Sequence, residues 1–332
     1  MRPKYCPVQR RELQQGLTLV ELLVAMAISA VVALAAISAL IISRQGFTTV
    51  DAASQLRDNA RFATDLIQRL GVQTGFVEID IATTTRPSDL TTNPITKVLG
   101  FNNSIPSSTD PSNSATARTV PTSLGFGSDV LILRYQTTAA FKGATISDRS
   151  MIDCFGNSPT VLPTDRDDLR SNVLHVALDN NGEPALMCST DTNVNSQPIV
   201  RGVENFQVLY GVDGVVAGTA VTATATSLAT TYLRADQMAV TPEITGVLTN
   251  ANWRRVRSIR IGMVIRGAIG SAQESAARTY YPFGLAISAS GGTPGSAMSS
   301  TNDAGTIFSP PADSRLRQVV TLTIHLRNES GL

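Results

Sequence analysis

The sequence predicts an α+β protein in which a long N-terminal α-helix packs on a largely antiparallel β-sheet domain. Three observations lead to this prediction. An apolar stretch near the N-terminus runs into a segment with helical periodicity. Several later segments alternate apolar and polar residues with the period of two that half-buried strands show. Polar segments rich in Ser, Thr and Pro separate these strands, as loops do.

The apolar stretch covers residues 17–42 and contains a single charged residue, Glu21. Its 26 residues would form a helix about 39 Å long. That length is sufficient to cross the hydrocarbon core of a bilayer, which is roughly 30 Å thick. A cleaved secretory signal normally has a shorter apolar region followed by a small-x-small cleavage site. We therefore predict that residues 17–42 are a transmembrane helix that the mature chain keeps.

Charge is distributed unevenly between the N-terminal segment and the rest of the chain. Residues 1–16 carry a net charge of +3, although the whole chain carries only +1. A positive segment before an apolar run is typical of an N-terminus that stays in the cytoplasm. The low overall charge argues against a broad nucleic-acid-binding surface, and we expect no direct binding of nucleic acid.

Residues 43–70 continue the helical periodicity but become amphipathic, with many Arg and Asp residues. Positions at three- and four-residue steps predict the face that packs on the globular domain: Phe47, Val50, Ser54, Phe62, Leu66, Ile67 and Leu70. Gly71 is the expected stop just after the helix. A single helix over residues 17–70 would be roughly 80 Å long.

Glu21 is unusual because it places a carboxylate inside the apolar run. Such a charge costs roughly 2.5–3.5 kcal/mol on insertion scales. We therefore expect it to have a partner, the alternative being that it lies at the membrane interface and stays hydrated.

The residues around Glu21, Gly16-Leu17-Thr18-Leu19-Val20-Glu21-Leu22-Leu23, resemble the class III signal of type IV prepilins and type II secretion pseudopilins. In that family a basic leader ends in Gly, an apolar residue follows, and Glu is the fifth residue of the mature chain. The resemblance implies that prepilin peptidase cuts after Gly16 and methylates the new amine of Leu17. It also implies a type IV pilin-like fold, with residues 1–16 as the leader. Glu21 would then pair with the N-terminal ammonium of an adjacent subunit, which would offset the cost of its burial.

Residues 71–332 are expected to form a globular, β-rich domain with polar loop insertions. The clearest alternation lies in residues 258–266 and 318–326. Shorter strand-like segments are residues 129–135, 173–178, 185–188 and 203–211, with Asn181-Gly182 as a turn. Residues 217–231 are interpreted as a loop whose Thr and Val content could also form a strand edge.

Several runs in this region resemble the PilW family of minor pilins, which corresponds to the J-type minor pseudopilins of type II secretion. The matching runs include Leu56-Arg57-Asp58-Asn59-Ala60-Arg61-Phe62-Ala63, Asp153-Cys154, Leu186-Met187-Cys188, Val203-Glu204-Asn205-Phe206-Gln207-Val208-Leu209-Tyr210-Gly211-Val212-Asp213, Trp253 and Leu322-Thr323-Ile324-His325-Leu326-Arg327-Asn328. In many relatives the run that ends at Asp213 leads into an Asp- and Gly-rich loop. Residues 214–231 contain no acidic residue, which argues against a calcium site there.

The chain contains three cysteines, Cys6, Cys154 and Cys188. Removal of the leader would leave the even pair that one disulfide in an oxidising compartment requires. We predict a disulfide between Cys154 and Cys188 if the domain is exported. Two free buried thiols are the alternative.

No motif for catalysis, a cofactor or a metal occurs in the sequence. Residues 179–183 are acidic, but their Gly is misplaced for an EF-hand and a hairpin turn explains them. His175 and His325 lie in strand-like runs without a nearby Cys or His, which favours structural roles over metal binding. Trp253 is expected to pack in the core. We therefore predict a protein that is not an enzyme and uses neither cofactor nor metal.

The first functional hypothesis is a PilW-like minor pilin of a Gram-negative type IV pilus. The resemblance implies a role in pilus initiation and tip assembly, supporting twitching motility, adhesion or DNA uptake. It implies these partners: prepilin peptidase, other minor pilins, the major pilin, the inner-membrane assembly platform and a tip adhesin. The chain would span the inner membrane with its C-terminal domain in the periplasm, and would lie in the pilus, near the tip, after assembly. The alternatives are a J-type minor pseudopilin and a membrane-anchored periplasmic enzyme or binding protein.

Overall fold

The computed structural model describes residues 18–82, 86, 93–243, 245–272, 274–286, 295–298 and 303–328. It divides into two compact units, one ending at Val50 and one running from Asp51 to Leu332. Gly16, Leu17 and Cys6 lie outside the described residues.

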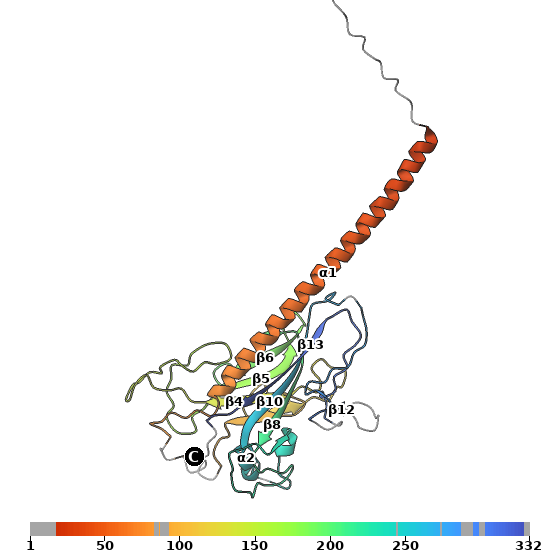
Figure 1. Ribbon diagram of the computed structural model, residues 1–332. Coiled ribbons are helices and arrows are strands. Elements are labelled where there is room, and N and C mark those ends of the chain that lie inside the picture. The colour runs from red at the N-terminus through yellow and green to blue at the C-terminus, as the bar shows by residue number, and fades with distance from the viewer. Residues whose placement is uncertain are drawn as a thin grey trace, which may run out of the picture. The chain divides into compact units, whose positions relative to one another are not determined.

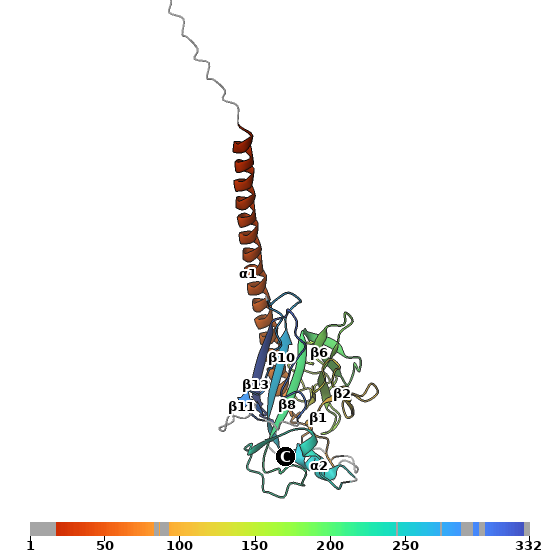
Figure 2. The same ribbon diagram turned by 90° about the vertical axis from the view of Figure 1, so that its right-hand side faces the viewer.

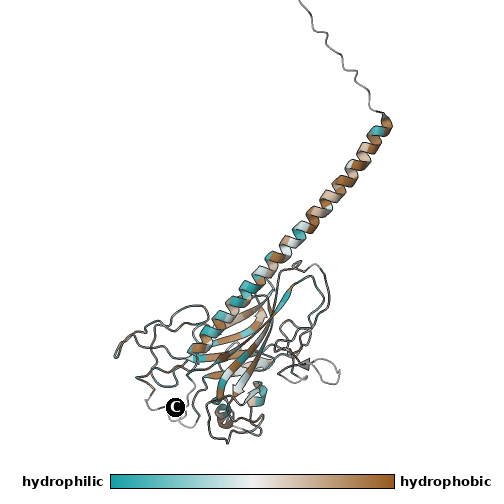
Figure 3. Cartoon of the chain, in the orientation of Figure 1, coloured by the Kyte–Doolittle hydropathy of each residue, from teal (hydrophilic) through white to brown (hydrophobic). Residues whose placement is uncertain are grey.

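Helix α1 (Leu19–Gln73) contains 55 residues and extends through both units (Figure 1). Its first part is apolar, and polar residues become frequent after about residue 43 (Figure 3). The predicted long helix with an apolar first half is therefore confirmed.

The second unit contains two main antiparallel sheets. The first has the strand order β1-β4-β5-β6-β7, and its strands are β1 (Val98–Phe101), β4 (Val130–Tyr135), β5 (Arg170–Leu178), β6 (Pro184–Thr190) and β7 (Gln197–Arg201). The second has the order β13-β10-β8-β9, and Figure 2 shows β13, β10 and β8 side by side. Its strands are β8 (Val203–Val212), β9 (Thr231–Leu233), β10 (Val256–Arg266) and β13 (Arg317–His325). The predicted α+β class with a largely antiparallel sheet domain is confirmed.

Smaller elements lie in the connections. They are β2 (Ser104–Pro106) paired with β3 (Ala115–Ala117), β11 (Leu285–Ala286) paired with β12 (Gly295–Ser296), the 3₁₀-helix η1 (Asp236–Met238) and helix α2 (Val247–Trp253). Of the ambiguous residues 217–231, only Thr231 enters a strand, as the first residue of β9.

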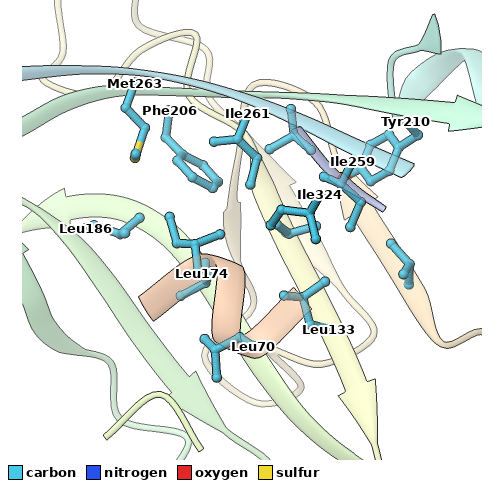
Figure 4. Close-up of a cluster of buried hydrophobic side chains, with 14 of the residues drawn as sticks. Leu70, Leu133, Leu174, Leu186, Phe206, Tyr210, Ile259, Ile261, Met263 and Ile324 are labelled. Atoms are coloured by element: carbon cyan, nitrogen blue, oxygen red, sulfur yellow. The ribbon is translucent and has the colours of Figure 1, made fainter. Parts of the chain in front are cut away.

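One core joins the C-terminal part of α1 to both sheets. In Figure 4, Leu70 of α1 points toward Leu133 and Leu174 of the first sheet, and Ile324 of the second sheet lies beside them. Trp253 is 3% exposed and meets Tyr210 edge to face, with 4.7 Å between the ring centroids. The prediction that Trp253 packs in the core is therefore correct.

The face of α1 that packs on the sheets agrees with the predicted one only in part. Its buried members from Leu56 to Leu70 include two alanines: Leu56, Ala60, Ala63, Ile67 and Leu70. Phe47, Val50 and Phe62 are instead 74%, 70% and 54% exposed. The prediction is therefore right for Leu66, Ile67 and Leu70. It is wrong for Phe47, Val50, Ser54 and Phe62, whose places on the buried side are taken by Leu56, Ala60 and Ala63.

The predicted helix stop at Gly71 is also wrong. Gly71 is helical, and a Cβ added there would come within 2.7 Å of Ile324 Cγ2. Gly71 is therefore required for close packing against β13. The helix ends at Gln73, and Gly75 with a φ of +78° turns the chain after it.

The Asp129 side chain and backbone connect the two sheets at the start of β4. Its carboxylate accepts hydrogen bonds from the backbone N–H of Val208 at 2.8 Å and of Asn103 at 2.9 Å. Its own N–H donates to the carbonyl of Phe206 at 2.8 Å. Burial raises the pKa of Asp129 well above its usual value. The hydrogen bonds from Asn103 and Val208 act in the opposite direction but do not outweigh burial.

Candidate assembly site on the N-terminal stem

The first described residues form a capping box at the start of α1. Thr18 donates from its backbone N–H and its hydroxyl to Oε2 of Glu21, at 2.9 and 3.0 Å. The N–H of Glu21 donates back to Thr18 Oγ1 at 3.3 Å. A Thr followed three residues later by Glu before an apolar run is the sequence signature of this cap. The Thr18-to-Glu21 spacing in the sequence is therefore the signal for this cap.

The apolar part of α1 leaves its side chains free for lipid or for other helices. Within the part of the chain that the structure describes, α1 is the one helix long and apolar enough to cross a bilayer, and that apolar window is 0% buried. The hydroxyls of Ser29 and Ser38 donate to the carbonyls of Ala25 and Leu34, at 2.7 and 2.8 Å. These polar groups are satisfied within the helix, as a nonpolar surrounding requires.

The outward side of the helix in the second unit carries Phe62 and several charged residues. Arg61 and Asp65 form an ion pair at 3.9 Å, with side chains 85% and 69% exposed. Such a pair contributes little to stability in water. The Phe62 side chain beside it is 54% exposed, so the described residues leave this apolar surface largely uncovered.

Cys154 and Cys188 are joined by a disulfide in the structure. Cys188 lies on β6, and Cys154 lies in the connection between β4 and β5. The N–H of Cys154 also donates to Asn172 Oδ1 on β5, at 2.8 Å. Both cysteines are buried. The disulfide fixes a long irregular connection to the first sheet.

Asp213 holds the loop that precedes β9 through its carboxylate. The carboxylate accepts hydrogen bonds from the N–H and hydroxyl of Thr226, at 2.7 and 2.8 Å, and from the N–H of Ser227 at 2.8 Å. Arg257 Nε lies 3.8 Å away and Arg255 Nη1 4.0 Å away. Burial raises the pKa of Asp213, but these hydrogen bonds and Arg257 outweigh burial and lower it below its usual value. The carboxylate is thus occupied by donors and cations of the same chain.

The acidic hairpin loop between β5 and β6 is also internally paired. The last pair of β5 and β6 joins Leu178 to Pro184, so the loop is longer than a two-residue turn. Within it, Asp179 Oδ1 accepts hydrogen bonds from the N–H groups of Asn181 and Glu183, at 2.8 and 3.0 Å. Asp179 pairs with Arg201 at 3.2 Å. Glu183 pairs with Arg266 at 2.7 Å. No group of three or more His, Cys, Asp or Glu suited to a metal ion occurs within the described ranges.

The two histidines occupy different environments. His175 on β5 is 3% exposed, and burial, with a smaller contribution from Arg118, lowers its pKa to about 4. His325 at the end of β13 is exposed.

A groove of about 780 Å³ lies between residues 121–126 and 303–311, with Glu204, Arg266, Asp313 and Arg317 among its lining residues. Glu204 accepts from Arg266 at 2.8 Å and from Arg317 at 2.6 Å. Asp313 pairs with Arg317 at 2.6 Å. Glu204, Arg266, Asp313 and Arg317 in the lining of the groove are thus paired with one another.

Comparison with known proteins places two family models on the chain. The prokaryotic N-terminal methylation motif matches residues 12–37. The family described as type IV pilus-assembly protein W, PilW, matches residues 173–328. A type IV-like pilin from Thermus thermophilus is 12% identical, with a TM-score of 0.36, covering 82% of this chain and 96% of that one. No curated protein sequence matches the chain.

Proposed function

We propose that this chain, on which the N-terminal methylation motif and the PilW family model both match, acts as a minor pilin in the assembly of a type IV pilus. The observation that carries this proposal is the presence of both matches on one chain, with α1 supplying an uncovered apolar stretch. A membrane anchor alone would not explain a PilW domain. A PilW domain alone would not explain the methylation motif.

We propose that prepilin peptidase cuts between Gly16 and Leu17 and methylates the new amine. Thr18 would then be the second residue of the mature chain and Glu21 the fifth. The positive leader supports a cytoplasmic N-terminus and a periplasmic C-terminal domain. Other minor pilins, the major pilin and the assembly platform are the proposed partners, with a place near the pilus tip.

We also propose that the Cys154–Cys188 disulfide forms in the periplasm after export. Mass spectrometry of the exported chain after thiol alkylation under non-reducing conditions should show neither cysteine alkylated. Alkylation of both would mean that the mature protein carries free thiols.

The proposed function is tested by deleting the gene and complementing it with an epitope-tagged copy. Deletion should lower surface piliation and twitching, complementation should restore both, and the tag should be found in pili sheared from the cells. Normal piliation together with a loss of secreted enzymes would instead identify a J-type minor pseudopilin.

A further inference from the structure

The open edge of the second sheet is unusual among the sheet edges of this chain. Strand β13 lies at one end of the order β13-β10-β8-β9 and pairs only with β10 in the described residues. Its register with β10 continues without a shift from Arg317 to His325. The strand contains neither Pro nor Lys. An exposed edge of this kind is a template for another strand.

The other three edges of the two main sheets are blunted. Strand β1 has 4 residues and β9 has 3. Strand β7 has 5 residues, includes Pro198, and pairs with β6 through a register shift. Short strands, proline and bulges are the usual means of preventing edge-to-edge pairing. Among the four edge strands of the two main sheets, only β13 is long, at 9 residues, and has neither a proline nor a bulge.

The hydrogen-bond register shows which backbone groups of β13 are open. Leu326 N–H donates to the carbonyl of Arg257, and Gly267 N–H donates to the carbonyl of Leu316. Both pairs continue the β10–β13 register, so even-numbered residues of β13 bond to β10. The odd-numbered residues therefore point their N–H and C=O groups to the open edge: Arg317, Val319, Thr321, Thr323 and His325. Within the described part of the chain, none of these backbone groups has a hydrogen-bond partner.

The two faces beside this edge indicate what kind of strand would fit. On the core side, Val320 and Leu322 are half-buried and pack against the core, next to the buried Ile324. On the opposite side, Thr321, Thr323 and His325 are exposed. An added strand with apolar residues on one face would complete the covering of Val320 and Leu322. Polar residues on its other face would continue the threonine row.

We infer that the β13 edge receives an extended segment of a neighbouring pilin subunit, with alternating apolar and polar residues, as an additional strand. This inference rests on the proposed function, because a pilus supplies subunits at close range. Main-chain hydrogen bonds to β13 would provide affinity. The half-buried Val320 and Leu322 would fix the register of the added strand against β13. The contact is between different surfaces of the two subunits, the kind that extends an assembly without closing it.

A proline at Thr323 tests the inference, because that residue directs its N–H to the open edge while Leu322 and Ile324 maintain the bonds to β10. Thr323→Pro should lower the amount of tagged chain in sheared pili about tenfold, the effect of one lost hydrogen bond to the partner. Thr323→Ala, which keeps the N–H, should be incorporated like the wild type. Thermal unfolding of both full-length variants in detergent should be similar. Incorporation of the proline variant at the level of the alanine variant would overturn the inference.

Photo-crosslinking gives a readout even if the proline variant does not fold. A benzoylphenylalanine at position 323 should crosslink to an extended segment of a subunit with a prepilin-type N-terminus, whether another pilin or a second copy. The same probe at the exposed Asn181, in the loop between β5 and β6 of the first sheet, should not reach that segment. A wild-type chain present in pili but uncrosslinked at position 323 would refute edge pairing alone. A wild-type chain absent from pili would refute the proposed function.

Discussion

The carboxylate of Glu21 has one observed use and one proposed use. In the single chain it completes the capping box with Thr18, whose two donors lie 2.9 and 3.0 Å from Oε2. In a pilus we propose that it also receives the N-terminal ammonium of an adjacent subunit. A carboxylate has enough lone pairs to accept from both. The cap would keep Glu21 hydrogen-bonded in the membrane until the neighbouring subunit arrives.

The first prediction separates these two uses. Glu21→Ala should leave cleavage of the leader intact but strongly reduce the tagged chain in sheared pili, because the neighbouring ammonium loses its partner. Thr18→Ala keeps the charge and removes only the cap, which costs about 1 kcal/mol of helix stability. It should be incorporated nearly as well as the wild type. An equal loss in both variants would show that capping, rather than charge pairing, is what assembly requires.

A second residue-scale prediction concerns His175. Its pKa of about 4 in the folded chain lies below the value of 6.5 expected when it is exposed. The unfolded chain therefore binds a proton first as the pH falls, and the free energy of unfolding decreases. The decrease should reach about 1.4 kcal/mol for each pH unit between about 6.5 and about 4.

Denaturant unfolding of the full chain in detergent at several pH values measures this effect. His175→Gln should show a smaller loss of stability over that pH range than the wild type. The prediction fails if His175→Gln keeps the full pH dependence.

At the scale of elements, the contact between α1 and β13 positions the helix on the sheets. Gly71 lies against Ile324, and a Cβ there would approach Cγ2 and Cδ1 to 2.7 and 2.9 Å. Because isoleucine is stiff at χ1, its Cγ2 has little freedom to move away. Close approach of the helix at this point depends on the missing side chain.

Gly71→Ala should therefore destabilise the chain, although alanine is the better helix former. The cost of overpacking is about 1–3 kcal/mol, which outweighs a helix gain of about 1 kcal/mol. Gly46→Ala is the matched control in the same helix, because no atom lies within 4 Å of the added Cβ. It should leave the denaturation midpoint unchanged or slightly raised. A rise of that midpoint in Gly71→Ala would contradict the packing argument.

The sequence was most informative where one physical signal dominated. The alternation in β10 and β13 located both strands to within two residues at either end, because their apolar faces cover one core. Every residue of β8 is buried, including the polar ones. The alternation of apolar and polar residues predicts an exposed polar face, and it does not show that loops cover that face. Ala60 and Ala63 carried no hydrophobic signal comparable with Phe62, yet they form the buried face. The lengths of the loops between strands, and the hydrogen-bond partners of residues such as Asp213, depend on tertiary contacts. These contacts cannot be predicted from local sequence patterns.

At the scale of the whole molecule, an ion network joins the two sheets at one end. Glu204 on β8 pairs with Arg266 of β10 and Arg317 of β13, and Arg266 also reaches Glu183 beside the first sheet. The Glu204 side chain is only 6% exposed. Its removal would leave Arg266 paired only with Glu183 and Arg317 paired only with Asp313, so each guanidinium would lose one of its two carboxylate partners in a poorly solvated place.

Glu204→Gln should lower the free energy of unfolding by about 3 kcal/mol, near the lower end for breaking a buried pair. Asp65→Asn breaks the exposed pair with Arg61 and should have no measurable effect. Denaturant titration of the full-length chain compares the two. Equal effects of the two variants would mean that the network contributes no more than a surface pair.

The central claim is that this chain is made as a prepilin and processed at Gly16-Leu17. Intact and N-terminal mass spectrometry of the protein from a strain with prepilin peptidase tests it directly. We predict a mature chain that begins with N-methyl-Leu17, and the uncut precursor in a strain without the peptidase. A chain that still begins at Met1 in the peptidase-positive strain, or one cut at a later position, would contradict the claim.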